Sequence, residues 1–396
     1  MQDSIPSAVS AILPEIVALR HDLHRHPELS GQEERTAGVV AGILADRGIA
    51  HRTGVGGSHG IVAEIRGTAG DGKTLALRGD MDALPIVEEN ETPYKSQVPG
   101  KMHACGHDGH TANLVGTALV LNRLRDRFAG RVRLLFQPAE ETVSGANAMI
   151  AGGAIDEVDA IVMLHGWPNL PSGTIGVRTG PAMASSDHFR LVLHGKGGHA
   201  AYPHHTVDPV LIGAQVVTAL QSVVAREINP VAPAVVSVTR FHAGTATNII
   251  SPSAELGGTV RTLDEALRQS MPERIERIIA GICNAFRAEY DFRYHFGTPV
   301  TVNSAPISEL IRQVGSELLG PDKVVELAEP TMGAEDFAFY VQKIPGAMFR
   351  LGVDCPYGLH HPKYDFGDAP LETGIAMMAG LAMRFNDAPA PPRLTA

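Results

Sequence analysis

The chain has 396 residues, of which 44% are hydrophobic, and a formal net charge of -10. This length exceeds what one ordinary core needs and suits two domains. The acidic balance excludes the basic face that nucleic-acid-binding proteins present, so we expect no nucleic-acid partner.

The first part of the chain alternates predicted helices and strands. Helical spacing of apolar residues predicts a helix over about 7–24, and a second over about 33–47 that stops at Gly48. A further helix follows His110. Predicted strands lie at 61–66, 74–78, 132–136 and 159–164. Nearly continuous apolar strands separated by helices indicate a mixed or parallel sheet that is covered on both faces.

The middle of the chain has a different pattern. Strands are predicted at 188–194, 235–241, 255–261 and 292–296, with long helices at about 207–227 and 264–289. The order β-α-β-β-α-β is that of a ferredoxin-like module, which can be inserted into a larger domain.

After about Thr301 the first pattern returns, with helices near 307–319, 335–342 and 371–384 and a strand at 348–351. The predicted fold is therefore α/β, a mixed sheet flanked by helices with an inserted ferredoxin-like α+β small domain. We expect residues 1–184 and 300–396 to form the larger domain and residues 185–299 the small one. From about 387 the chain is rich in Pro and Ala, and we predict a disordered tail.

Three cysteines, Cys105, Cys283 and Cys355, suit a reducing compartment better than a disulfide scaffold. The segment Met1 to Ile12 lacks a basic region followed by an apolar core, so no signal peptide is expected. We see no stretch with the apolar length of a membrane span. The expectation is a cytoplasmic protein without a membrane partner.

Four segments concentrate residues that carry chemistry, and each ends a predicted strand or lies in a loop. The first, 78–85, places Asp80 and Asp82 on either side of one residue at the end of an apolar strand. Taken alone, it is equally well explained as a turn whose acids cap the neighbouring backbone.

The second segment, 102–110, holds three histidines, one cysteine and one aspartate within eight residues. Thiolate and imidazole are ligands that borderline-soft divalent metals prefer. Gly106 lets the backbone bend so that Cys105 and His107 can face one ion. This density at the start of a helix favours a metal site.

The third segment, 136–141, ends in the adjacent carboxylates Glu140 and Glu141. Such a pair is costly at the exit of a buried strand unless a cation is near. A metal would resolve the repulsion for one of them and leave the other to accept protons. The alternative is a solvated acidic loop.

The fourth group is split between His165, which follows the strand at 160–164, and the pair His360 and His361. Single histidines of this kind are more often structural than metal-binding. Their position at strand ends of the same α/β unit gives them weight. In the middle region His199, Asn248 and Arg261 could bind an oxyanion and a substrate carboxylate, although ordinary loop chemistry explains them as well.

Taken together, these segments resemble the aminoacylase/carboxypeptidase metallohydrolases, in particular the hippurate hydrolases and indole-acetyl-amino-acid amidohydrolases. The matching stretches occur in the expected order over nearly the whole chain. They are residues 79–85, 102–110, 136–141, 198–200, 332–337 and 359–362.

The resemblance implies two divalent metal ions per subunit, with manganese, zinc, nickel and cobalt all compatible. The implied ligands are Cys105, His107, Glu141, His165 and His360, with Cys105 bridging the two ions. His360 is preferred over His361 because His361 falls where the family has a variable residue before proline.

The same resemblance implies roles around the metals. Glu140 would be the catalytic base, and Asp82 would orient a metal-bound imidazole. His199 would polarise the scissile carbonyl, in a dimer that pairs through the small domain. Asn248 and Arg261 would hold the substrate carboxylate.

The expected activity is metal-dependent hydrolysis of the amide bond of small N-acyl amino acids, hippurate-like or N-acetyl, to a carboxylic acid and a free amino acid. A dipeptidase or carboxypeptidase with the same metal site is the first alternative. A cysteine hydrolase that uses Cys105 as its nucleophile is the second.

Overall fold

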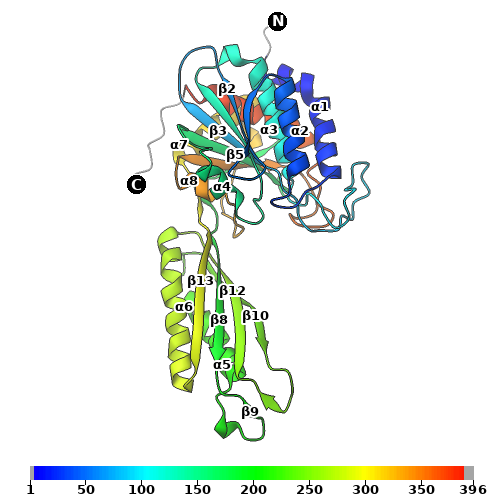
Figure 1. Ribbon diagram of the computed structural model, residues 1–396. Coiled ribbons are helices and arrows are strands. Elements are labelled where there is room, and N and C mark those ends of the chain that lie inside the picture. Colours follow the sequence, from blue (N-terminus) through cyan, green and yellow to red (C-terminus); the bar gives the residue numbers. More distant parts are fainter. Residues whose placement is uncertain (1–3, 388–396) are drawn as a thin grey trace. The chain divides into compact units, whose positions relative to one another are not determined.

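The computed structural model describes residues 4–387, and the chain divides into two compact units (Figure 1). Unit 1 contains the residues up to Ala182, Val302–Glu329 and those from Asp336 onward. Unit 2 contains Met183–Thr301 and Pro330–Glu335. That these units behave as separate domains stays a prediction, and so does the disordered tail, because residues 388–396 lie outside the described part.

Unit 1 is built on an eight-stranded mixed sheet, which confirms the predicted fold class. The strand order is β1-β2-β4-β3-β5-β16-β6-β15. The strands are β1 (Ala50–Val55), β2 (Gly60–Arg66), β3 (Thr74–Asp80), β4 (Arg131–Gln137), β5 (Ala160–Trp167), β6 (Ile175–Val177), β15 (Val324–Glu326) and β16 (Gly346–Gly352). The central strands β4, β3, β5 and β16 pair in parallel, so their carboxyl ends share one edge of the sheet. The strands β7 (Gly180–Met183) and β14 (Thr301–Asn303) form a separate two-stranded sheet.

Helices cover the central sheet because its strands are apolar on both faces. One face carries α1 (Ile5–Arg25), α2 (Glu34–Asp46), α3 (His107–Arg123), α7 (Ala305–Leu318) and α9 (Ala369–Arg384). The shorter α4 (Gly145–Ala151) and α8 (Ala338–Val341) contact strands β4 and β16 and each other. The main core lies under the long helices, where Ile16 and Leu23 of α1 are fully buried.

Unit 2 has the β-α-β-β-α-β order of a ferredoxin-like module. Its antiparallel sheet has the order β10-β12-β8-β13 and carries α5 and α6. The elements are β8 (Ser186–His194), α5 (Pro209–Ser222), β10 (Ala234–Ala243), β12 (Ser253–Thr262), α6 (Glu265–Phe286) and β13 (Glu289–Thr298). A small ladder of β9 (Gly198–His199) with β11 (Ile249–Ile250) lies beyond one end of this sheet (Figure 1).

Two predicted helices have other bounds in the structure, and the strand β1, the helix α4 and several strands of two to four residues were not predicted. The helix expected at 335–342 is only the single turn of α8, because residues 335–337 belong to the chain crossing between the units. The helix expected after His110 begins three residues earlier, at His107, since Gly106 adopts a left-handed φ of 91° that starts the turn. The edge strand β1 was missed because four of its six residues are exposed and it has no apolar alternation.

The expectation that no stretch has the apolar length of a membrane span also needs correction. The helical segment Pro209–Glu227, which is α5 and the π-helical turn Val223–Glu227, is long and apolar enough by composition. Its apolar character has a structural reason in this fold. Ile212, Val216 and Leu220 form part of the core of unit 2.

Candidate metal centre

The residues expected to bind metal come from different segments of unit 1. The topology brings the ends of β3, β4 and β5 together, because parallel neighbours expose their carboxyl ends at one edge. Asp82 follows β3, the acidic pair Glu140 and Glu141 follows β4, and His165 lies within β5. Cys105, two residues before α3, and His107, the first residue of α3, join the same cluster.

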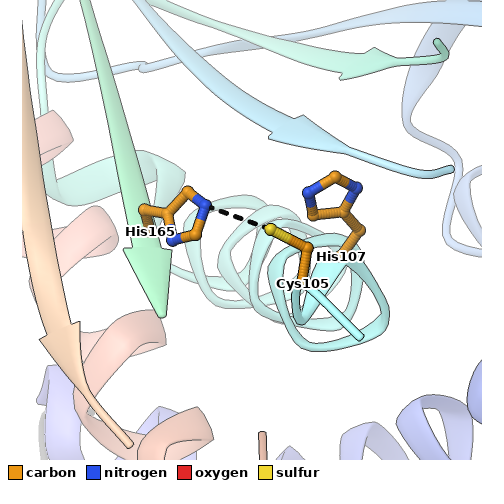
Figure 2. Close-up of side chains that lie close together, drawn as sticks. All are labelled: Cys105, His107 and His165. Atoms are coloured by element: carbon orange, nitrogen blue, oxygen red, sulfur yellow. Dashed lines mark hydrogen bonds between the residues drawn. The ribbon is translucent and has the colours of Figure 1, made fainter. Parts of the chain in front are cut away.

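Cys105 is at the centre of the resulting cluster. It lies with His107 and His165 in one set, and with Glu141 and His360 in another. Within each set the ligand atoms lie within 4.8 Å of one another. Figure 2 shows the first set, in which the Cys105 Sγ is 3.6 Å from Nε2 of His165. A third set joins His107 to Glu140 and Glu141, so the thiol and the acidic pair line one site.

The two imidazoles of the first set present their Nε2 atoms to the cluster. Nδ1–H of His107 donates to the backbone oxygen of Asp82 at 2.9 Å and to its Oδ1 at 3.2 Å. Nδ1–H of His165 donates to the oxygen of Gly166 at 2.8 Å. These bonds fix the ring orientations and leave Nε2 of each ring as a ligand.

The adjacent histidines His360 and His361 have different surroundings. His360 adopts a left-handed φ of 63°, and its Nε2 lies 3.3 Å from Oε1 of Glu141. The ring of His361 instead stacks on Tyr357, and its Nδ1 accepts a hydrogen bond from the backbone N–H of Lys363. The geometry therefore directs only His360 toward the cluster.

The donor set fits a metal pair. Nε2 of His107 is buried and has no hydrogen-bond partner among the described residues; Oδ2 of Asp80 lies 3.6 Å away, and Cys105 and His165 share a candidate ligand set with His107. A buried polar atom without a partner is uncommon and points to a missing ion or water. One thiol, three imidazoles and one carboxylate are a mixed S, N and O set that suits borderline-soft divalent ions.

The protonation of the cluster supports the same conclusion. Burial, and then the negative charge of Glu141, raise the pKa of the Cys105 thiol. Hydrogen bonds to Cys105 and Glu141 raise the pKa of His360 to about 10. Burial opposes the charged form of His107, but Asp80 and the thiol outweigh it and raise its pKa well above the usual value. A metal ion at these side chains would compete with their protons, so metal binding should release protons.

Some supporting residues were not assigned from the sequence. Asp80 is fully buried, where its Oδ2 accepts from Arg78 at 2.6 Å and its Oδ1 accepts from Nδ1–H of His110 at 2.6 Å. The N–H of Gly166 donates to Nε2 of His110 at 2.8 Å, so His110 holds the peptide next to His165. The density of histidines in 102–110 indicated a functional segment, but it did not show which histidines bind metal and which hold the neighbouring backbone.

Asp336 is a second buried support that the sequence did not assign. Its carboxylate accepts from Arg78, Gln137 and the N–H of Ala146. The N–H of Asp336 in turn lies 3.4 Å from Oε1 of Glu140. The side chain of Glu140 is thus held at a buried position, with 8% of its surface exposed.

The remaining predicted residues, His199, Asn248 and Arg261, lie at two separate places in unit 2. His199 and Asn248 are neighbours on the small ladder, where the N–H of Ala200 donates to the oxygen of Asn248. Arg261 pairs with Val235 at the other end of the sheet and is half-buried, which lowers the pKa of its guanidinium. The structure therefore brings His199 and Asn248 together and separates Arg261 from them.

Comparisons with known proteins agree with this geometry. Residues 76–384 match the model of peptidase family M20/M25/M40. The chain is 46% identical to the N-acyl-L-amino acid amidohydrolase of Geobacillus stearothermophilus over 306 residues, 76% of this chain and 81% of the relative. It is 41% identical to the N-acetylcysteine deacetylase of Bacillus subtilis over 376 residues, covering 95% and 98%.

A solved structure has the same fold over nearly the whole chain. The Bacillus subtilis YxeP protein, described as a dinuclear metal-binding peptidase of family M20, superposes with a TM-score of 0.86 at 37% identity. The match covers 96% of this chain and 99% of that one.

Proposed function

Since the chain belongs to peptidase family M20/M25/M40, we propose that it hydrolyses the amide bond of N-acyl amino acids to a carboxylic acid and a free amino acid. Two similar proteins that match most of the chain are named as an N-acyl-amino-acid amidohydrolase and a deacetylase. The observation that carries the proposal is the sharing of Cys105 between two three-residue ligand sets, with Glu140 at their edge.

We propose that two divalent ions would be held by the side chains of Cys105, His107, Glu141, His165 and His360, with Cys105 common to both ligand sets. Manganese, zinc, nickel and cobalt all suit this set, and availability decides among them. When bound, such ions polarise a carbonyl and lower the pKa of water. Asp82 orients the imidazole of His107 through their hydrogen bond, and this supports its role in positioning a ligand.

The protein residues perform the proton transfers. Glu140 accepts a proton from the attacking water and then donates it to the departing amine, so one carboxylate serves both halves of the reaction. His199 polarises the scissile carbonyl and holds the developing negative charge. Asn248 and Arg261 bind the substrate carboxylate.

The protonation of Cys105 argues against a cysteine hydrolase. A nucleophilic cysteine needs a lowered pKa, so that thiolate is present at neutral pH. Burial and Glu141 raise the pKa of Cys105 instead. The thiol is a poor nucleophile in this site and a natural metal ligand once an ion displaces its proton.

The spread of the unit 2 residues supports a dimer. His199 and Asn248 lie beyond the end of β12 that starts at Ser253, and Arg261 lies near its other end. Eight strand residues at roughly 3.3 Å each separate these ends by about 26 Å, which exceeds the length of an N-acyl amino acid. One unit 2 therefore does not place all three on one substrate, and we propose that His199 and Asn248 come from a second copy.

Exposed apolar residues of unit 2 are consistent with that pairing. Leu211 on α5 is 49% exposed, Phe241 on β10 is 38% exposed and Ile249 is 53% exposed. β10 is also an edge strand with unpaired backbone groups along one side.

We also propose that the protein is cytoplasmic. Its three free, buried thiols support a reducing compartment.

A substrate panel combined with metal analysis tests the function. The purified chain is assayed on N-acetyl, N-benzoyl and indole-acetyl amino acids and on dipeptides, before and after chelation. We expect turnover of N-acyl amino acids, loss on chelation and recovery with a divalent ion. Activity that survives complete metal removal would contradict the proposal. A preference for dipeptides would show that the enzyme is a dipeptidase or carboxypeptidase.

A further inference from the structure

The peptide unit before Glu140 has an unusual conformation. Ala139 has a φ of 55°, in the left-handed region that side chains with a Cβ rarely adopt. It is also buried, with 7% of its surface exposed. A non-glycine residue persists in this region only when its surroundings hold it there, and such residues cluster at functional sites.

Glu33 holds this residue from a distant part of the chain. Its Oε1 accepts the N–H of Ala139 at 2.8 Å across 106 positions of sequence, and also accepts the N–H of Gly31 at 2.9 Å. Glu33 stands at the N-cap position of α2, yet its side chain makes no capping bond to that helix. The carboxylate is therefore directed to the turn before Glu140 instead of its own helix.

Asp82 holds the backbone on the other side of Glu140. Its Oδ2 accepts the N–H of Glu141 at 3.0 Å and the hydroxyl of Ser30 at 2.6 Å. The peptide N–H groups immediately before and after Glu140 thus each donate to a buried carboxylate. Ser30 and Glu33 lie three residues apart. One short loop therefore supplies the carboxylate that binds the N–H of Ala139 and the hydroxyl that holds the carboxylate of Asp82.

The position of Glu33 is unfavourable by itself. The residue has no solvent exposure, its Oε2 has no hydrogen-bond partner among the described residues, and burial raises the pKa of its carboxyl group. A buried carboxyl without a cation is a weak source of stability. Its two N–H contacts are better explained by a need to fix the turn.

We propose that Glu33 is a positioning residue that sets the left-handed turn at Ala139 and so aims Glu140 at the reacting water. The inference rests on the proposed function for the role of Glu140 as the base. Among the described residues, no hydrogen bond joins the Glu33 side chain to a predicted ligand or substrate-binding group, and Glu33 acts through the backbone of Ala139. Asp82 fixes the backbone of Glu141 independently, so loss of Glu33 should misplace the base more than the metal ligand.

Two substitutions and one control test the proposal. Glu33→Ala removes both acceptor contacts, and we expect kcat to fall about 10- to 100-fold, since a displacement of about 1 Å has that effect. KM and the number of bound metal ions should stay near the wild-type values. Glu33→Gln keeps a carbonyl oxygen for both N–H groups and should restore most of kcat. Glu34→Ala, at the exposed neighbouring position, should leave kcat unchanged.

The outcomes separate positioning from a general structural effect. Wild-type kcat in Glu33→Ala would overturn the proposal, and so would an equal loss in Glu33→Gln, because Gln keeps the acceptor. A crystal structure of Glu33→Ala supplies a readout that needs no activity. A changed φ at Ala139 and a shifted Glu140 support the inference, and an unchanged turn overturns it. If the wild-type chain hydrolyses no N-acyl amino acid, the proposed function fails while this structural result still stands.

Discussion

The carboxylate of Asp82 and the imidazole of His107 form one structural pair, with Oδ1 of Asp82 3.2 Å from Nδ1 of His107. The hydrogen bond fixes the tautomer of the ring and turns Nε2 toward the thiol and the acidic pair. Hydrogen bonds from His107 and Ser30 and the N–H of Glu141 outweigh burial and lower the pKa of Asp82. The acceptor therefore stays charged when a metal arrives.

Replacing Asp82 should weaken metal binding. Asp82→Ala removes the acceptor of the His107 ring, so we expect about a 10- to 100-fold lower affinity for manganese or zinc. Calorimetric titration of the metal-free chain measures it. Asp71→Ala, at a side chain that is 92% exposed, is the matched control. An unchanged affinity in Asp82→Ala would contradict the role given to the pair.

Glu140→Gln should separate chemistry from metal binding. The amide keeps the shape of the side chain and can still accept from the N–H of Asp336, but it cannot take a proton. We expect both ions to remain bound and kcat to fall by about 100-fold or more. Metal analysis and steady-state kinetics on the same preparation decide. Near-normal turnover would remove Glu140 as the base.

Metal should protect Cys105 from alkylation. The coordinated sulfur is not available to an electrophile, whereas the metal-free thiol can be modified or oxidised. We expect several-fold faster modification of Cys105 in the metal-free chain, read by peptide mass spectrometry. Cys283 and Cys355 are free and buried, and serve as internal references whose rates should not change. Equal rates at Cys105 would place the ions elsewhere.

Mixing two inactive variants tests the dimer. Suppose one subunit carries Glu140→Gln and the other carries His199→Ala. If His199 acts across the interface, one site of each mixed dimer regains an intact Glu140 and an intact His199. Random reassortment should then return about a quarter of wild-type activity, because about half of the dimers are mixed and each has one complete site. No recovery after confirmed subunit exchange would show that His199 acts within its own subunit or not at all.

His24 should make stability depend on pH. Burial lowers the pKa of His24, but Asp108 and Glu88 outweigh it and raise the pKa to about 9. Since the folded pKa lies above the unfolded value of about 6.5, the stabilisation is complete below pH 6.5 or so and is lost as pH rises through about 9. We expect the stability difference between wild type and His24→Gln to shrink by an amount on the order of 3 kcal/mol over that window. Chemical unfolding at several pH values measures it, and a constant difference would refute the assignment.

The sequence by itself determined the order of most of the long helices and strands and the types of side chain that form the site. Apolar periodicity and capping residues are local signals, so α1, α6 and α9 were predicted nearly to their ends. The dense cluster at 102–110 and the acidic pair at 140–141 indicated a metal because residue types alone set ligand preference. The roles of the ligands remain proposals, but the structure does bring their side chains together.

Only the tertiary structure decided which groups support that chemistry. Nothing near Glu33 in the sequence indicates that its carboxylate holds the N–H of Ala139, and nothing near His110 indicates that it holds the peptide after His165. Such contacts depend on how distant segments pack and on single backbone angles, such as the left-handed φ of Ala139 and His360. The spacing of residues in the sequence predicts neither the long-range contacts nor these backbone angles, because the angle of one turn is set by the buried partners that surround it.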